Sequence, residues 1–338
     1  MTEAAVKTVG FKENERNVFF HILTACNLSC AHCYINTAEH GNECVSRQTM
    51  DKWLRLFYTP DARTNLVFLG GEPTMHPDLV HGIRRARKIG YDSITVDTNG
   101  YLFHEFLDKV TPEEVVLSFS LDGPNPEVND PIRGSGSFDT CLQNLKKAVA
   151  RGFRVSVIYT VSRKNLEYLE KMVPLLSGSG VARFFIQVIG IRGKSTRDRD
   201  NLQLLPEEWL RTVPEVAGKM AESGIPTIYP KVFLEPNEGF ECAGNVADNY
   251  FIFPNGRVYR CPLCEDFPFN TYMIEEGRLV KKEGITEEKL FGLTIPEGCV
   301  MNRILQEGNI VYDENKLPSY RISCCLLKQE ITPPNHPE

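Results

Sequence analysis

Short apolar runs rich in β-branched and aromatic residues alternate along most of the chain with longer segments of helical period. The runs predict six strands, at residues 18–23, 66–69, 94–96, 115–121, 155–161 and 184–189. The segments between and after them predict six helices, at 49–58, 76–89, 102–110, 138–150, 166–176 and 207–222. Strands that alternate with helices pair in parallel through right-handed crossovers. The pattern therefore predicts an α/β fold, either an open barrel or a doubly wound sheet.

The alternation stops after residue 224, where residues that interrupt helices and strands indicate a linker. These residues are Pro226, Pro230, Pro236 and Gly239. A second region begins near Cys242, with aromatic-rich strand candidates at 250–253 and 257–260. The Asn255-Gly256 dipeptide between them is typical of a tight hairpin turn. Residues 1–16 are short and polar, and we expect them to form a strand or an arm.

Composition narrows the class of protein. The chain has 338 residues, of which 42% are hydrophobic and 24% charged, enough for one large or two ordinary globular domains. No apolar run approaches the ~20 residues of a membrane helix, so no membrane contact is expected. Eleven cysteines are too sparse for a disulfide scaffold, and no signal peptide precedes them, which favours a reducing cytoplasm. The net charge of −6 argues against a nucleic-acid partner.

Three cysteines follow the first predicted strand at C-x3-C-x2-C spacing: Cys26, Cys30 and Cys33. Thiolates favour soft metals and iron-sulfur clusters, and three of them leave one iron of a 4Fe-4S cubane open to bind a ligand. The alternative is a zinc knuckle. A closed structural zinc site takes four ligands, usually from paired C-x2-C units, so the spacing favours a cluster.

Other polar motifs follow the next strands. In a parallel barrel or sheet, ligands collect at the carboxyl ends of the strands. The motifs at that edge are Gly70-Gly71-Glu72-Pro73, Asn99 in Asp97-Thr98-Asn99-Gly100, and Ser120. Thr160 and Gln187 reach the same edge from the fifth and sixth strands, but strand alternation alone leaves the face they occupy open. The two glycines permit close backbone approach, which an ordinary tight turn also requires.

The cysteine loop followed at the next strand end by the GGEP motif resembles the radical S-adenosylmethionine (SAM) superfamily of enzymes, over about residues 17–224. The resemblance implies a partial (β/α)6 TIM-like barrel. It also implies a 4Fe-4S cluster on the three cysteines, with SAM bound through its amino and carboxylate groups at the open iron. One electron then cleaves SAM to methionine and a 5'-deoxyadenosyl radical.

The resemblance also suggests the SAM contacts. The strand end made by Gly70, Gly71, Glu72 and Pro73 would help to place SAM, and the backbone of His32 would contact its adenine. Asn99 and Ser120 offer hydrogen bonds to the ribose or carboxylate, with turn formation as the alternative role. Arg133 would form a bidentate pair with the methionyl carboxylate, or lie exposed on the surface. Thr160 and Gln187 complete the expected set, while the catalytic acid or base stays unassigned.

The C-terminal cysteines resemble the SPASM or twitch extensions of the same superfamily. The match consists of Cys242, then Gly256 five residues before Cys261. The resemblance implies one auxiliary 4Fe-4S cluster, with Cys264 as a third ligand and Cys324 or Cys325 as the fourth. Six cysteines after residue 240 cannot give two clusters four thiolates each. A structural zinc is the alternative. We therefore expect an arm at 1–16, a barrel at 17–224 and an auxiliary-cluster domain at 225–338.

The predicted function is hydrogen-atom abstraction from an organic substrate, with flavodoxin or ferredoxin as the electron donor. Four basic residues at 192–199 favour an anionic substrate group, or else form a solvated loop. The short N-terminal arm leaves no room for a leader-peptide or cobalamin domain, which slightly favours a small molecule. The alternatives are modification of a ribosomal peptide or protein side chain, and a non-catalytic zinc or iron-sulfur scaffold.

Overall fold

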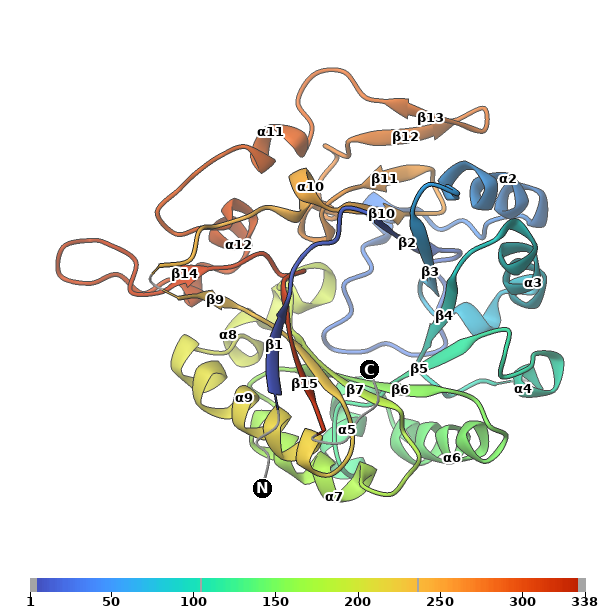
Figure 1. Ribbon diagram of the computed structural model, residues 1–338, viewed down its shortest axis with the longest axis horizontal. Helices are drawn as coiled ribbons and strands as arrows, with labels where there is room; N and C mark the ends of the chain where they lie inside the picture. Colours follow the sequence, from blue (N-terminus) through green and yellow to red (C-terminus); the bar gives the residue numbers. More distant parts are fainter. Residues whose placement is uncertain (1–4, 104, 236, 334–338) are drawn as a thin grey trace.

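Six consecutive parallel strands form the centre of the fold in the computed structural model, which describes residues 5–103, 105–235 and 237–333 (Figure 1). These strands lie side by side in chain order. They are β2 (Glu15–His21), β3 (Arg63–Leu69), β4 (Ser93–Thr98), β5 (Val116–Ser120), β6 (Val155–Val161) and β7 (Arg183–Val188). The six predicted strands and their parallel pairing are confirmed.

Helices follow each of these strands and lie around the outside of the curved sheet (Figure 1). They are α2 (Arg47–Phe57), α3 (Leu79–Ile89), α4 (Phe106–Lys109), α5 (Pro126–Arg133), α6 (Ser137–Ala150), α7 (Met172–Leu176), α8 (Arg199–Leu202) and α9 (Pro206–Glu222). Two predicted helices are shorter than expected. The segment at 102–110 is helical only over α4, and the segment at 166–176 begins as a 3-10 helix, Leu166–Lys171. The partial (β/α)6 barrel is confirmed.

Strand alternation decides which side chains face the barrel interior. In β6, Val155, Val157 and Tyr159 are fully buried, because they pack under the helices. The alternate residues, including Thr160, are partly exposed and face inward. Gln187 is the register partner of Thr160 on β7, so both residues lie on the interior face. The structure thus places both side chains on the interior face, a choice that the sequence alone left open.

The sheet continues beyond the six units on both sides. β8 (Thr227–Pro230) pairs in parallel with β7, and β10 (Asp248–Ile252) pairs in parallel with β2. β15 (Lys328–Thr332) and β1 (Ala5–Val9) then extend the β8 edge in antiparallel fashion. The predicted linker is wrong in its first part, because strand β8 occupies it; Pro236 lies outside the described residues. The domain boundary at residue 224 stays a prediction, since the sheet runs across it.

The C-terminal region builds onto the opposite edge. β10 and β11 (Arg257–Tyr259) form the predicted hairpin, with Gly256 at φ +84°, and β12 (Tyr272–Glu275) and β13 (Arg278–Lys281) continue it. The remaining elements are α1 (Thr37–His40), β9 (Phe233–Leu234), α10 (Ala243–Val246), α11 (Glu288–Phe291), α12 (Val300–Leu305) and β14 (Arg321–Ile322). None of the described helices combines the length and the apolar character of a membrane span.

Candidate functional site

The cysteine loop leaves β2 and is held by the glycine-rich end of β3. The Gly71 backbone N–H donates to Leu23 O at 2.9 Å, and the Glu72 N–H donates to Ala25 O at 3.0 Å. A Cβ added to Gly71 would lie 2.0 Å from Ala25 O. Gly70 has φ +146°, and a Cβ there would lie 2.1 Å from Leu23 O. The two glycines therefore permit close approach to the cysteine loop itself.

Glu72 joins the ends of β3 and β4 from within the protein. Its side chain is fully buried, and its carboxylate accepts hydrogen bonds from Thr98 Oγ1 and the Asn99 N–H, both at 2.7 Å. Burial raises the pKa of Glu72, and these donors oppose the shift. Pro73 opens a short 3-10 helix, Pro73–Met75, where its restricted φ suits the first position. Glu72 thus supports the strand ends through these hydrogen bonds.

Asn99 contacts the cysteine loop directly. Its Nδ2 donates to Asn27 Oδ1 at 2.9 Å and lies 3.7 Å from Cys26 Sγ. Its Oδ1 accepts from the Tyr101 N–H at 2.9 Å, which is the turn-forming role considered from the sequence. Asn99 therefore serves its own turn and at the same time fixes the start of the loop.

A buried acid holds the other end of the loop. Asp122 Oδ2 lies 2.7 Å from Arg133 Nε and 3.0 Å from His32 Nε2, and Oδ1 accepts from the Thr160 N–H at 2.7 Å. Burial alone would raise the pKa of Asp122, but the Arg133 guanidinium and the His32 imidazole hold it at about 2. Arg133 is only 7% exposed, so the surface alternative for this residue is wrong. Ser120, two residues before Asp122, is partly exposed at the end of β5.

Asp122 belongs to the Ser120-Leu121-Asp122-Gly123 motif at the end of a predicted strand, but the sequence gives it no role in the site. Only the folded chain brings His32 and Arg133 onto one carboxylate. The backbone adds a further tie, because the Ala31 N–H donates to Ile132 O at 2.8 Å. The loop is therefore held at both ends, by the β3–β4 edge and by α5.

The thiols of the loop have the chemistry that a cluster needs. Cys30 and Cys33 are partly exposed and Cys26 is exposed. Burial raises the pKa of Cys30; Arg133 opposes the shift, while Asp122 and Cys33 add to it. Thiolates this close together need a compensating cation, which bound iron supplies. In the described chain no three His, Cys, Asp or Glu side chains converge on a single ion, but a 4Fe-4S cluster takes one thiolate per iron.

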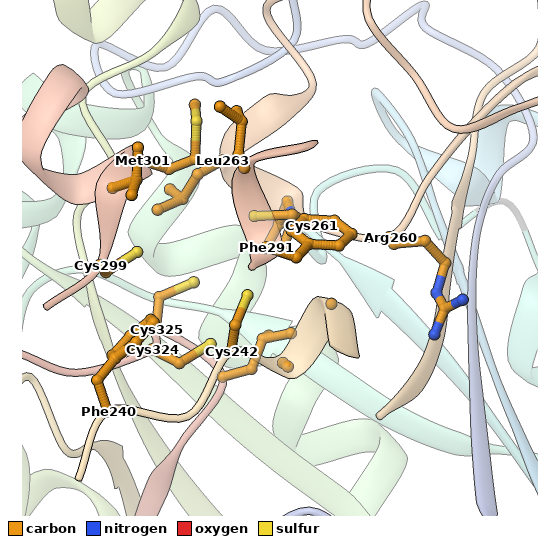
Figure 2. Close-up of a pocket in the computed structure, with 16 residues that line it drawn as sticks. Phe240, Cys242, Arg260, Cys261, Leu263, Phe291, Cys299, Met301, Cys324 and Cys325 are labelled. Atoms are coloured by element: carbon orange, nitrogen blue, oxygen red, sulfur yellow. The ribbon is translucent and has the colours of Figure 1, made fainter. Parts of the chain in front are cut away.

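A second group of thiols lines a pocket in the C-terminal region, called here the second thiol cavity (Figure 2). Five cysteines contribute to it: Cys242, Cys261, Cys299, Cys324 and Cys325. The sequence leaves open which of Cys264, Cys299, Cys324 and Cys325 complete the ligand set, and the wall of this pocket includes Cys299. Apolar side chains, including Phe240, Phe291 and Met301, form the rest of the labelled wall together with Arg260.

Cys264 does not line this cavity. Its thiol is buried beside Cys261, where that neighbour and then burial raise its pKa, and Glu287 adds to the shift. In contrast, burial raises the pKa of Cys242 and of Cys299 to about 12, and other thiols of the cavity add to both shifts. The structure thus places Cys299 among the candidate ligands and Cys264 behind them.

The loop at 192–199 connects the two groups of thiols. The Arg192 guanidinium is buried, ion-paired with Glu265, and 4.7 Å from the centre of the Tyr34 ring. The Lys194 N–H donates to Cys33 O at 2.9 Å, and its ammonium donates to Ser29 Oγ at 2.7 Å. The expectation of a free basic run at substrate entry is therefore wrong for Arg192, which is ion-paired with Glu265, whereas the Lys194 ammonium has only the neutral Ser29 hydroxyl as its partner among the described residues.

Two histidines complete this connection. His21 and His40 stack on Phe253, each with ring centroids 4.0 Å from it. His21 Nε2 lies 2.8 Å from the Tyr34 hydroxyl, and His40 Nε2 lies 3.1 Å from Glu265 O. The stack joins β2 and α1 to the hairpin of the C-terminal region.

Comparison with known proteins agrees with this geometry. Residues 21–176 match the radical SAM superfamily. The chain contains a radical SAM domain. The predicted resemblance is thus confirmed, together with the cofactors of such a domain, a 4Fe-4S cluster and SAM.

Curated relatives of the radical SAM domain are enzymes of several kinds. The chain is 30% identical over 225 residues to Fe-coproporphyrin III synthase of Methanosarcina barkeri, covering 64% of this chain and 55% of that one. It is 32% identical over 174 residues to the mycofactocin maturase MftC of Mycobacterium tuberculosis, covering 46% and 40%. The probable GTP 3',8-cyclase of Saccharolobus solfataricus is 26% identical over 192 residues, covering 54% and 61%. The chain spans about half the length of these relatives.

Solved structures share the fold. Streptococcus suis SuiB bound to S-adenosylmethionine superposes with a TM-score of 0.62 at 16% identity, covering 75% of this chain and 61% of that one. The enzyme anSMEcpe with bound AdoMet superposes with a TM-score of 0.57 at 12% identity, covering 89% and 85%. At these identities the comparison establishes the architecture alone.

The contact between the strand end and the cysteine loop predicts the effect of one methyl group. Gly71→Ala places Cβ 2.0 Å from Ala25 O and 2.5 Å from Thr24 O, and backbone atoms cannot rotate away. We expect the loop to shift and the reconstituted protein to lose about four irons per chain. Gly218→Ala in α9 is the matched control, with no contact within 4 Å. Equal iron and sulfide contents in the two variants would contradict this account.

The buried histidines predict a pH dependence of stability. Burial is the main cause that lowers the pKa of His40 to about 4, whereas an unfolded histidine titrates near 6.5. The unfolded chain therefore binds the proton first as the pH falls. Neutral His40 makes its full contribution to the free energy of unfolding above about pH 6.5. Between about pH 6.5 and pH 4 this contribution decreases by up to about 1.4 kcal/mol per pH unit, and below pH 4 it is lost.

Urea denaturation of the anaerobic protein between about pH 7 and pH 4 measures this dependence. In His40→Asn, the slope of the unfolding free energy against pH should decrease by about 1.4 kcal/mol per pH unit, which corresponds to the uptake of one proton. This holds whatever the absolute stability of the variant. A slope equal to that of the wild-type protein would contradict the assignment of this pH dependence to His40.

Proposed function

We propose that the protein is a radical SAM enzyme that cleaves SAM reductively and abstracts a hydrogen atom from an organic substrate. The observation that carries this proposal is the C-x3-C-x2-C loop held by Gly70, Gly71 and Glu72 at the carboxyl edge of the parallel barrel. A bound cluster would pass an electron from the donor to SAM, and the cleavage of SAM would supply the radical. The chain supplies the placement and a shielded barrel interior.

The residues divide into ligands, SAM contacts and positioning groups. Cys26, Cys30 and Cys33 would hold the cluster. The backbone of His32 and of the Gly70–Gly71 strand end would contact SAM, while Asn99 holds the loop from beneath. Arg133 differs from the sequence expectation: its ion pair with Asp122 supports a positioning role in place of direct carboxylate binding.

Side chains on the interior face supply further contacts. Ser120, Thr160 and Gln187 end three adjacent strands with neutral hydrogen-bonding groups on the interior side. Neutral groups suit ribose hydroxyls, because they need no charge compensation. These three residues are therefore assigned to SAM or to the substrate next to it.

The second thiol cavity would hold one auxiliary 4Fe-4S cluster. Four thiolates suffice, and the five lining cysteines offer them: Cys242, Cys261, Cys299, and Cys324 or Cys325. Next to the Cys325 thiol, and with the Leu326 and Ala243 N–H groups directed at it, the pKa of the Cys324 thiol is lowered despite burial. Either thiol of the adjacent Cys324–Cys325 pair could supply the fourth thiolate. An open iron and a fully ligated cluster remain the two forms to separate.

The nature of the substrate is the second part of the proposal. Relatives include a maturase named for mycofactocin and a cyclase named for GTP, and SuiB, which shares the fold, has been solved with a precursor peptide, so both a peptide and a small molecule have precedents. A small organic molecule is the first candidate, and modification of a peptide side chain is the second. A low-potential donor such as flavodoxin or ferredoxin would supply the electron.

Reductive cleavage of SAM tests the proposed activity. Anaerobically reconstituted, reduced protein with SAM should form 5'-deoxyadenosine, and Cys30→Ala should lower this rate at least about a hundredfold, because the cluster loses one of its three protein ligands. The matched control is Cys44→Ala, an exposed cysteine outside both thiol groups. A non-catalytic scaffold is the correct description if the wild-type protein forms no 5'-deoxyadenosine with or without candidate substrates.

Metal content tests the auxiliary site. The wild-type protein should bind about eight irons and eight sulfides per chain, twice the content of one 4Fe-4S cluster. Cys299→Ala, which alters the cavity wall, should reduce this number or destabilise the second cluster. Cys264→Ala should leave it unchanged, because Cys264 lies outside the cavity. The reverse order of effects would show that the ligand set is misassigned, and zinc in place of iron would show a structural zinc site.

A further inference from the structure

The barrel interior contains an acid that neither group of thiols explains. Asp97 is the penultimate residue of β4, in which Ile94, Val96 and Thr98 are buried on the helix side. Asp97 therefore faces the interior. Its register partner on β5 is Ser118, whose hydroxyl favours the charged carboxylate. Burial nevertheless raises the pKa of Asp97 to about 6, with Ser118 and Lys328 opposing the shift.

A lysine enters the same interior from the C-terminal strand. Lys328 is the first residue of β15 and pairs with Pro230, the last residue of β8, so it lies at the carboxyl edge of the barrel. Its ammonium lies 4.6 Å from the centre of the Phe185 ring, which is on the interior face of β7. Among the described residues it has no carboxylate within the 4.0 Å of an ion pair. Its charge is thus only partly compensated.

The two charges face each other without contact. Each affects the pKa of the other in the direction of opposite charges, yet they form no direct ion pair within the described chain. Burial lowers the pKa of Lys328; Cys325, Asp97 and Glu15 oppose that shift, and Arg183 adds to it. Lys328 and Asp97 thus act on one another from the interior faces of β15 and β4.

We infer that Lys328 and Asp97 bind opposite ends of one molecule in the barrel interior. Lys328 binds an anionic oxygen group, carboxylate or phosphate, and Asp97 accepts a hydrogen bond from an ammonium or hydroxyl group. The ligand class is a small zwitterion or hydroxylated anion, free or presented by a peptide. Calling this ligand the substrate rests on the proposed function. The predicted anionic group is then recognised at Lys328, whereas Arg192 and Lys194 serve the loop.

The chemistry supports this placement. A partly buried ammonium that lacks an anion is costly, and a charge-assisted hydrogen bond to a ligand oxygen offsets that cost. Concave sites typically combine apolar walls with a few polar groups that fix orientation. Here Phe185 supplies apolar surface beside the lysine, and Asp97 supplies the opposite polar contact.

Isothermal titration calorimetry of the reconstituted, SAM-loaded protein tests the site, with acetate, inorganic phosphate and glycine as probes. The wild-type protein should bind acetate or phosphate at one site per chain, and the better probe identifies the anion class. Lys328→Met should weaken that binding at least about tenfold, and Lys328→Arg should retain most of it because the charge remains. The control Lys146→Met changes an exposed lysine of α6.

A second comparison tests the acid. Glycine adds an ammonium to acetate, so Asp97→Asn should weaken glycine binding about fivefold or more and leave acetate binding unchanged. Absence of saturable anion binding by the wild-type protein, or equal binding by Lys328→Met, overturns the site. Glycine that binds no more tightly than acetate overturns the role of Asp97.

The same preparations separate this inference from the proposed function. Formation of 5'-deoxyadenosine is measured beside each titration. If the protein binds anions through Lys328 but never cleaves SAM, only the proposed function is contradicted. If it cleaves SAM but binds no anion, only the inference is contradicted.

Discussion

Backbone contact between the β3 strand end and the cysteine loop is the constraint on which the candidate site depends. Gly71 meets Ala25 O at a distance that excludes a Cβ atom. Hydrogen bonds from Gly71 and Glu72 then fix the loop before its first cysteine. Because each thiolate must reach a different iron, small shifts of the loop would separate the ligands. The glycines therefore act on the metal site through the chain, without touching the metal.

A buried polar network extends this constraint to the C-terminal region. Arg192 holds Tyr34 and Glu265 together, and Phe253 stacks between His21 and His40. Buried polar groups of this kind are costly unless all are paired, so the network favours one relative placement of its parts. The two groups of thiols consequently keep a defined separation, with the barrel interior between them. Lys328 and Asp97 lie in that interior.

One continuous sheet also fixes the C-terminal region relative to the barrel. β10 pairs with β2, which precedes the cysteine loop, and β15 pairs with β8 at the other edge. The C-terminal strand brings Lys328 into a barrel built almost entirely from residues more than a hundred positions earlier. The region after residue 224 is therefore part of the wall of the candidate site as well as a possible holder of a second cluster.

The sequence by itself determined the six strand-helix units and the first thiol site. Strand and helix periods are local, and Cys26, Cys30 and Cys33 lie within eight residues, so neither depends on long-range contacts. Tertiary structure decided the rest. Asp122 with Arg133, Cys299 in the second cavity, and Lys328 opposite Asp97 each join residues from separate strands or loops. Such pairs form when distant segments share one sheet and one interior, which no local pattern records.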